Sequence, residues 1–193
     1  MQNPFPFIIY GAGGHGKVIA ETLSLMNCQD VFFWDKNDSA SQMDQKVYPP
    51  FQGPAGKVIL GMGNLSVRKE ILAEKGELID FFESFLCHPT AFVSPSAQIG
   101  KATWIGPQAI VHSFAKIGDH GIINSGSIVD HDVHLGNNVH IAPGATLCGH
   151  VSIGDHSFVG ANAVVIPGIK IGSNVFIKAG SLVKEDVLDG AVI

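Results

Sequence analysis

The stretch INSGSIVDHDVHLGNNVHIAPGATLCGHVSIGD, residues 123–155, decides the fold of this chain. Every sixth residue in it is a branched aliphatic, and the same period runs through residues 93–183 without a change of register. The sixteen aliphatic positions are Val93, Ile99, Ile105, Val111, Ile117, Ile123, Val129, Leu135, Ile141, Leu147, Ile153, Val159, Val165, Ile171, Ile177 and Val183. A period of six fits neither an isolated helix nor an isolated strand. It is typical of a hexapeptide β-solenoid.

In such a solenoid each hexapeptide forms one short strand on one flat side, and its aliphatic residue points inward. Four residues after the aliphatic the side chain is mostly small or β-branched, as at Ala109 and Ser127. Three sides close one coil, so residues eighteen apart should stack. Sixteen hexapeptides therefore predict about five coils.

Composition limits the possible functions. The net charge of −5 and the absence of a basic run argue against nucleic acid as a partner. Three scattered cysteines indicate a reducing compartment rather than a disulfide framework. The first ten residues have no charged region followed by a long apolar run, so no signal peptide is expected. No apolar stretch of the sequence approaches the length of a membrane span, so none is expected either. We therefore expect a cytoplasmic protein.

The residues before the array predict a small α/β domain. Phe5–Tyr10 and Val31–Trp34 are apolar runs of strand length, and Lys17–Asn27 between them has helical spacing. A third strand at Val58–Gly61 and a helix at Asn64–Lys75 follow. The chain thus predicts a Rossmann-like βαβαβ domain at residues 1–88 and a solenoid at residues 89–193.

The loop GAGGHG, Gly11–Gly16, lies between the first strand and the first helix. It has the form of a dinucleotide fingerprint, in which glycines let the backbone approach a diphosphate at a helix N-terminus. Only about half of a full doubly wound fold precedes the solenoid, so NAD is disfavoured. The diphosphate of a nucleotide-sugar is favoured, and a purely structural glycine turn is the alternative.

The hexapeptide array, GAGGHGKV near the start, INSGSIVDHD at Ile123–Asp132 and IAPGATLCGHVSIGD at Ile141–Asp155 together resemble the NeuD/PglD-type sugar acetyltransferases. These are left-handed β-helix acyltransferases that act on sialic acid or on nucleotide-linked amino sugars. The resemblance covers nearly the whole chain. It implies acetyl-CoA as co-substrate, a left-handed parallel β-helix, and a homotrimer with active sites between subunits. The family usually continues with a Gly-x-Pro-Ala-Lys segment that helps to cover coenzyme A, and this sequence stops at Ile193, before that segment.

His131 lies between Asp130 and Asp132. A carboxylate beside an imidazole fixes its tautomer, so the other ring nitrogen can accept a proton. Taken alone, the residue could equally be an exposed histidine on an acidic turn. In the resembling family this histidine and the following acid form the catalytic pair, which implies that His131 is the general base and that Asp132 holds it. Asn124 would orient the same site, or else belong to an inward asparagine ladder.

The resemblance also assigns the acetyl-CoA site. His140 corresponds to a histidine that contacts the co-substrate, although it could be a polar surface residue. Gly149 corresponds to a glycine whose N–H faces the thioester oxyanion. Ala161 and Ala179 stack with Ser125 at intervals of eighteen and would form a smooth groove for the pantetheine arm, or a contact with a second subunit.

The acceptor is expected at the N-terminal domain. Gly13, Gly14 and His15 would meet the diphosphate at the loop. Asp35 would pair with the uracil or ribose donors. Lys36 or Arg68 would pair with phosphate.

Seven histidines lie in the array, which raises the alternative of a zinc-dependent hydratase of the γ-carbonic-anhydrase kind. Such a site needs two histidines five residues apart, and this sequence has none. We therefore expect no metal and interpret His112, His120, His150 and His156 as solvated turn residues.

The resemblance implies acetyl transfer from acetyl-CoA to a UDP-linked 4-amino sugar. Because no nucleophilic serine or cysteine adjoins His131, we expect direct transfer rather than an acyl-enzyme. O-acetylation of sialic acid or a related sugar is the first alternative. A non-catalytic nucleotide-sugar binding protein is the second.

Overall fold

The chain divides into two compact units, Met1–Glu83 and Ser84–Ile193, and the computed structural model describes residues 5–36 and 45–193. Strand β5 (Leu86–Cys87) pairs in parallel with β8 (Trp104–Ile105). The solenoid therefore begins before His88–Pro89, where the sequence placed the boundary.

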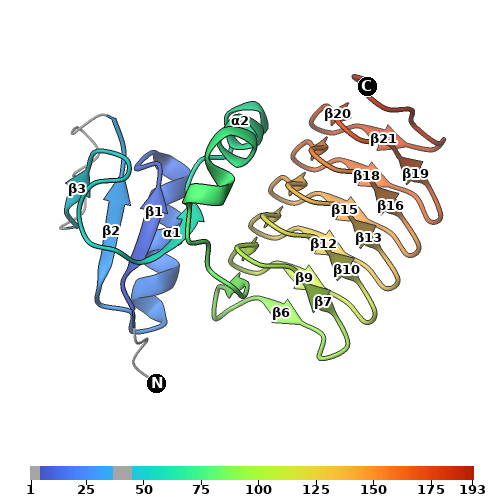
Figure 1. Ribbon diagram of the computed structural model, residues 1–193. Helices are drawn as coiled ribbons and strands as arrows, with labels where there is room; N and C mark the ends of the chain where they lie inside the picture. Colours follow the sequence, from blue (N-terminus) through green and yellow to red (C-terminus); the bar gives the residue numbers. More distant parts are fainter. Residues whose placement is uncertain (1–4, 37–44) are drawn as a thin grey trace. The chain divides into compact units, whose positions relative to one another are not determined.

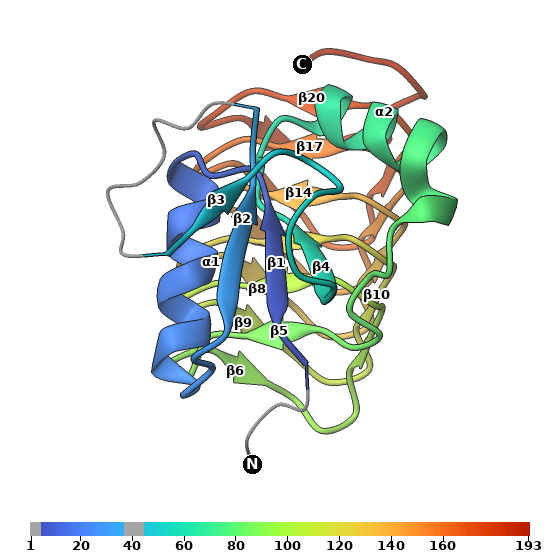
Figure 2. The same ribbon diagram turned by 60° about the vertical axis from the view of Figure 1, so that its left-hand side comes forward.

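The N-terminal unit contains a parallel sheet of four strands in the order β3-β2-β1-β4 (Figure 2). Its strands are β1 (Phe7–Tyr10), β2 (Val31–Trp34), β3 (Val47–Tyr48) and β4 (Lys57–Leu60). Strands β1, β2 and β4 confirm the three expected strands. Strand β3 has two residues and was not expected, because a run this short carries no periodic signal.

Two α-helices, α1 (Gly14–Leu25) and α2 (Leu65–Lys75), accompany this sheet, and the 3₁₀ helix η2 (Gly76–Leu78) follows. Helix α1 buries Ile19 and Leu23, which are four residues apart and so share one helix face. Helix α2 begins where the Asn64 side chain accepts hydrogen bonds from two backbone N–H groups of the first turn. No helix in the described ranges has both the length and the apolar character that a bilayer crossing needs.

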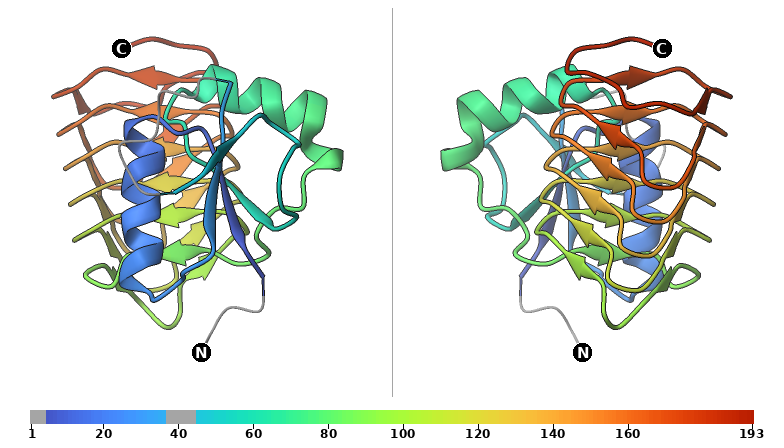
Figure 3. Two further views of the ribbon diagram at one scale, coloured as in Figure 1. Left: turned by 90° about the vertical axis from the view of Figure 1, so that its left-hand side faces the viewer. Right: turned by 90° about the vertical axis from the view of Figure 1, so that its right-hand side faces the viewer.

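The C-terminal unit is a parallel β-solenoid of three sheets, in which the coils stack one on the next (Figures 1 and 3). Sheet B contains β5, β8, β11 (Ile122–Ile123), β14 (His140–Ile141), β17 (Phe158–Val159) and β20 (Phe176–Ile177). Sheet C contains β6 (Phe92–Val93), β9 (Ile110–Val111), β12 (Ile128–Val129), β15 (Thr146–Leu147), β18 (Val164–Val165) and β21 (Leu182–Val183). Sheet D contains β7 (Gln98–Ile99), β10 (Lys116–Ile117), β13 (His134–Leu135), β16 (Ser152–Ile153) and β19 (Lys170–Ile171).

The predicted register is confirmed, because every strand pair in the solenoid joins residues eighteen apart, such as Val129 and Leu147. The inward aliphatic positions from Ile105 to Val183 are all buried. Val93 and Ile99, in the first coil, are half-buried and pack on the edge of the same core. Burying one such side chain contributes about 1.5–3 kcal/mol, so the repeated aliphatic is the main stabilising feature of the coil.

Two features form the corners of the solenoid: a left-handed backbone conformation, and hydrogen bonds between stacked coils. At most corners the third residue after the aliphatic has a positive φ, as at Asn138 (51°) and Gly144 (70°). At the corner between sheets D and B, side-chain oxygens accept hydrogen bonds from the coil before, as Asp155 does from Asn137 N at 2.6 Å. A Cβ on Gly136 would lie 2.2 Å from that same carboxylate oxygen. The frequent glycine after the aliphatic therefore lets stacked coils approach each other.

Candidate functional site

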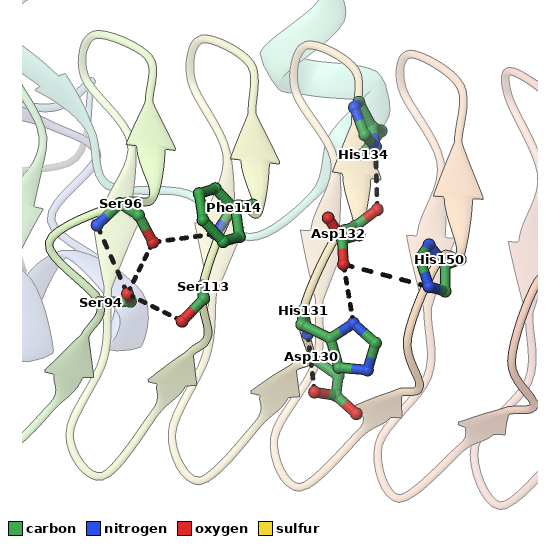
Figure 4. A network of polar contacts seen from close by, with 9 residues as sticks. All are labelled: Ser94, Ser96, Ser113, Phe114, Asp130, His131, Asp132, His134 and His150. Carbon is green, nitrogen blue, oxygen red and sulfur yellow. Dashed lines mark hydrogen bonds and ion pairs between the residues drawn. The ribbon is translucent and has the colours of Figure 1, made fainter.

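The turns after β12 and β15 stack on one another and form what we call the histidine corner: Asp130, His131, Asp132, Gly149 and His150. His131 Nδ1 lies 2.8 Å from Asp132 Oδ2, and the backbone N–H of His131 donates to Asp130 Oδ1 at 2.6 Å (Figure 4). Asp132 carries the left-handed conformation of the turn, with φ 58°. The turn itself thus brings two consecutive side chains into hydrogen-bond contact.

The carboxylates around His131 change its ionisation. The hydrogen bond to Asp132 raises the pKa of His131 above its ordinary value, and the charges of Asp130 and Asp132 add to this against an opposing desolvation. The same hydrogen bond lowers the pKa of Asp132, and nearby histidines reinforce that shift. Because Nδ1 faces the carboxylate, Nδ1 carries the ring proton and Nε2 is left as the basic nitrogen. The His131 side chain is 49% exposed, so Nε2 is accessible.

Gly149 lies against the His131 ring. A Cβ on Gly149 would come within 2.6 Å of both Cε1 and Nε2 of His131. Glycine is therefore required for the ring to occupy this place. The Gly149 N–H is not engaged by any protein acceptor among residues 5–36 and 45–193. An unengaged backbone donor beside a histidine can stabilise negative charge on a bound molecule.

His150 also belongs to this corner, although the sequence indicated a solvated turn residue. Its Nε2 lies 4.0 Å from Asp132 Oδ2, and its ring meets the His131 ring edge-to-face at a centroid distance of 5.1 Å. His134 Nδ1 lies 3.0 Å from the backbone oxygen of Asp132 (Figure 4). His131, Asp132 and His150 offer three ligand atoms within 4.8 Å of one another, which is a spacing that could hold a metal ion. The expectation of no metal stays a prediction.

Asn124 and His140 meet at a different corner, between sheets B and C. Asn124 Oδ1 accepts from Ser125 N at 2.8 Å, which turns the amide Nδ2 toward His140 Nε2 at 3.2 Å. Nε2 is therefore an acceptor, and the His140 proton lies on Nδ1. His140 is 7% exposed and packs edge-to-face on Phe158 at 5.0 Å. Within this chain Asn124 thus orients His140 and does not contact His131.

Ala161 and Ala179 extend this second corner along the solenoid. The backbone bonds Asn162 N to Pro143 O and Gly180 N to Ala161 O confirm that the small-residue column is stacked. Ala161 is half-buried and Ala179 is exposed. The surface of this column is therefore accessible. This accessibility fits a groove for an extended ligand, and it fits a contact with a second subunit equally well.

The expected site residues of the solenoid therefore form two groups. His131, Asp132 and Gly149 lie at the histidine corner, which follows strand β12. Asn124 precedes the same strand. One chain does not bring the two groups together.

The N-terminal unit has a cavity of about 720 Å³ at the carboxyl ends of its strands. In this sheet β1 has β2 on one side and β4 on the other. The order in which strands are added therefore reverses at β1, and ligands of open α/β sheets bind at such a point. Tyr10, Trp34 and Phe51 line the cavity with mutually packed rings at centroid distances of 5.2–6.2 Å. Asp35 and Lys36 line it as well.

The glycine loop is tied to this cavity through Asp35, whose Oδ2 accepts the Ala12 N–H at 2.8 Å. Gly13 and Gly14 are exposed at the start of α1, and no side chain caps that end of the helix. A Cβ on either glycine would meet nothing within 4 Å. His15 is half-buried in the first turn. The start of α1 is therefore open at these two glycines, and no side chain caps its first N–H groups.

Arg68 occupies a different place from the one expected. Its guanidinium is buried, and Nη1 donates to the backbone oxygens of Leu60 and Met62 at 3.1 and 3.2 Å. Burial lowers the pKa of Arg68 to about 9. Arg68 joins α2 to the end of β4 and does not line the cavity. Of the two residues expected to pair with phosphate, only Lys36 therefore lines the cavity.

Sequence reasoning missed His150 and the aromatic lining of the cavity. His150 lies eighteen residues after Asp132, so the eighteen-residue stacking of the coils could have predicted that the two residues are neighbours. His120, also taken as solvated, is 8% exposed. The aromatic cluster joins residues from three separate segments, and no local pattern indicates it.

Two protein families match the two units of the chain. Residues 6–75 match the PglD N-terminal domain. Residues 96–131 and 150–185 match the bacterial transferase hexapeptide of six repeats.

Three solved structures resemble nearly the whole chain. The acetyltransferase domain of PglB from Neisseria gonorrhoeae FA1090, solved with acetyl coenzyme A, is 33% identical; the match covers 97% of this chain and 94% of that one, with a TM-score of 0.89. PerB from Caulobacter crescentus, solved with CoA and GDP-perosamine, is 30% identical over 100% of this chain and 95% of that one, with a TM-score of 0.88. WeeI from Acinetobacter baumannii AYE, at 23% identity over 97% and 95% and a TM-score of 0.86, supports the fold alone.

Proposed function

Because this chain belongs to the sugar acetyltransferases that join a PglD N-terminal domain to hexapeptide repeats, we propose that it acetylates the amine of a UDP-linked 4-amino sugar. The carrying observation is the contact of His131 Nδ1 with Asp132 Oδ2 at 2.8 Å, beside the unengaged N–H of Gly149. A base, a group that holds it and an oxyanion donor are the parts that acyl transfer requires.

In the proposed reaction the neutral amine attacks the thioester carbonyl of acetyl-CoA. His131 Nε2 removes a proton from the nitrogen as the C–N bond forms, and Asp132 stabilises the resulting imidazolium. The Gly149 N–H donates to the oxygen that becomes negative. The C–S bond then breaks, and the imidazolium returns the proton to the departing thiolate. The chain itself supplies no covalent intermediate in this scheme.

The second corner would bind the co-substrate. The relative PglB was solved with acetyl coenzyme A and PerB with CoA. The open column that includes Ala161 and Ala179 suits a pantetheine arm, and His140, oriented by Asn124, lies at its start. His140→Ala would therefore act mainly on the KM for acetyl-CoA.

The acceptor nucleotide would bind in the N-terminal unit. PerB was solved with GDP-perosamine, a nucleotide-sugar. The aromatic rings of the cavity offer a surface for a base, and Lys36 offers a charge for phosphate. The exposed start of α1 at Gly13 and Gly14 offers N–H groups to the diphosphate, with His15 beside them.

Thiol release from acetyl-CoA tests the proposed function directly. The purified protein would be given UDP- and GDP-linked amino sugars, CMP-linked and free sialic acid, and no acceptor. We expect release above the no-acceptor rate with a UDP-linked 4-amino sugar. Release only with sialic acids would replace the amine by a hydroxyl acceptor. Release with none of them, despite acetyl-CoA binding, would contradict an acetyltransferase of nucleotide-sugars.

A pair of glycine variants separates diphosphate binding from fold. Gly14→Ala places a methyl group in open space, so we expect an unchanged or slightly higher Tm. The same methyl group would occupy the place of a bound diphosphate, so Kd for the nucleotide-sugar should rise at least about tenfold, which corresponds to about 1.4 kcal/mol. Gly16→Ala is the control: its Cβ would lie 2.0 Å from Gly11 O, so this variant should lower Tm. Calorimetric titration with UDP measures the first effect, and unchanged UDP binding in Gly14→Ala would contradict a diphosphate at this loop.

We also propose a homotrimer whose sites form between subunits, because His131 and His140 lie at different corners of one coil. Co-expression of His131→Ala with His140→Ala tests this arrangement. In randomly assembled trimers about a quarter of all interfaces would join an intact His131 to an intact His140, so activity at low acetyl-CoA should exceed that of either variant alone. The control is a mixture of the two variants purified separately. No gain on co-expression would contradict a shared site.

A further inference from the structure

Phe51 has a backbone conformation that phenylalanine seldom adopts. It lies in the tight turn Pro49–Gln52 after strand β3, which the Gln52 N–H closes by donating to Pro49 O at 3.0 Å. The φ of Phe51 is 64°, and the residues that usually take a positive φ at this place of a turn are glycine and asparagine. Bulky residues in this region are strained, and such residues are frequent at ligand sites. The turn alone therefore gives no reason for a phenylalanine here.

Contacts with two strands hold this turn in place. The indole Nε1 of Trp34, the last residue of β2, donates to Gln52 O at 2.8 Å. Gly53 follows the turn with φ 94°, and a Cβ on it would lie 2.7 Å from Cγ of Tyr48, the last residue of β3. The chain after Phe51 thus packs tightly on β2 and β3, and it presents the Phe51 ring from a fixed position.

The Phe51 ring lines the cavity of the N-terminal unit. It packs on Trp34 at 5.2 Å and on Tyr10 at 6.2 Å between ring centroids, and yet Phe51 is 44% exposed. Val67 of α2 lines the same cavity and is 41% exposed. Covering such apolar surface with an apolar part of a ligand is favourable. The other rings therefore support Phe51 on one side, and the rest of its surface is open to a ligand.

The polar groups of the cavity indicate the class of ligand. Lys36 lines the cavity, and so does Asp35, which accepts the Ala12 N–H of the glycine loop. A nucleoside diphosphate joins a planar base to a charged diphosphate, so it matches an aromatic surface beside a cation and a glycine loop. A wholly apolar ligand would match only the rings.

We propose that Phe51 stacks on the nucleobase of the acceptor, and that the strained turn Pro49–Gln52 holds its ring in place for this contact. The inference rests on the proposed nucleotide-sugar acceptor. Trp34 supports the Phe51 ring rather than binding the edge of the base, because its only N–H donor is engaged by Gln52 O. Stacking recognises the flat face that every base has. Phe51 therefore contributes affinity for the base and none for the diphosphate.

Three variants separate the ring from the turn. Phe51→Asn removes the ring but suits the backbone, since Asn138 and Asn162 already have φ 51° and 55°. Phe51→Tyr keeps an aromatic ring at the same place. Phe114→Asn is the matched control, because Phe114 also has a positive φ (59°) and is 62% exposed, but it belongs to the solenoid.

Calorimetric titration of the full-length protein with UDP measures the contribution of the base. We expect Phe51→Asn to raise Kd for UDP about tenfold or more, the usual effect of removing one stacked aromatic ring. Phe51→Tyr and Phe114→Asn should bind UDP as the wild type does. Kd for inorganic pyrophosphate, measured by phosphorus NMR, should be the same in all four proteins. Tm should change little in Phe51→Asn, because relief of the strained turn offsets the lost ring packing.

An unchanged Kd for UDP in Phe51→Asn would overturn the inference, and so would an equal loss of UDP and pyrophosphate binding. Phe51→Tyr binding as weakly as Phe51→Asn would overturn it as well. If the wild type binds no UDP at millimolar concentration, GDP and CMP replace it as probes, since stacking does not depend on the identity of the base; binding of none of the three would also overturn the inference. The proposed function is decided separately, by thiol release from acetyl-CoA.

Discussion

His131→Ala is expected to lower kcat by about 10²–10⁴-fold, the usual contribution of a general base. The ring it removes has Nδ1 bound to Asp132 at 2.8 Å and Nε2 open to a substrate. Because His131 is 49% exposed and its backbone bonds remain, the variant should keep its Tm. Acetyl-CoA binding should stay near wild type, because the proposed co-substrate groove lies at the other corner. Steady-state kinetics, with calorimetric titration of acetyl-CoA, measures both.

Two further variants identify the cause of that loss. Asp132→Asn should cost less than His131→Ala, because it removes the charge and keeps some orientation of the ring. His134→Ala is the matched control, since the His134 ring lies against the backbone oxygen of Asp132 and not against the ring of His131. Near-normal kcat in His131→Ala would show that the acceptor amine needs no protein base.

The pH dependence of the reaction follows from the same contact. The base form of His131 is the deprotonated ring, so the rate should rise with pH through the pKa of His131. Asp132 and Asp130 raise this pKa, so the acid limb should lie above the ordinary histidine value. Asp132→Asn removes the main cause of the shift, and its acid limb should move to lower pH. A limb that moves upward in Asp132→Asn would contradict this arrangement.

Gly149→Ala should lower kcat to within about tenfold of the His131→Ala value. Its Cβ would lie 2.6 Å from Cε1 and Nε2 of His131, so the ring must leave its place and its contact with Asp132. A misplacement of about 1 Å in a catalytic group can cost about 10²-fold. Tm should change little, because the clash is with an exposed side chain that can turn away, rather than with backbone.

The double variant His131→Ala/Gly149→Ala tells how Gly149 acts. If the glycine serves only to seat the ring, the double variant should be no slower than His131→Ala. An additional loss would indicate that the methyl group also disturbs the oxyanion donor or the substrate. Full activity in Gly149→Ala would contradict the close packing of ring and glycine as a requirement of the reaction.

Much of the fold could be predicted from the sequence, because every hexapeptide of a solenoid repeats the same pattern of one inward aliphatic residue. Each inward aliphatic needs only its neighbours at intervals of six and eighteen, so Val129 and Leu147 were placed in register before any tertiary contact was known. The two-residue strand β3 lacked such a period and was not found. Strands β1 and β2 were found, since each has four residues, largely buried.

For the site, the sequence by itself determined the contact between His131 and Asp132, because consecutive residues in a tight turn remain close in any coil. It also determined the exposed glycines at the start of α1. Tertiary structure alone decided the rest. The ring of His150 meets Asp132 only after one full coil of chain, and Asn124 turns toward His140 because its amide is held by Ser125. Arg68 became internal because the carbonyl groups that end β4 accept its guanidinium. The direction of a side chain depends on the acceptors and charges that distant segments bring to it, and neither composition nor spacing records those.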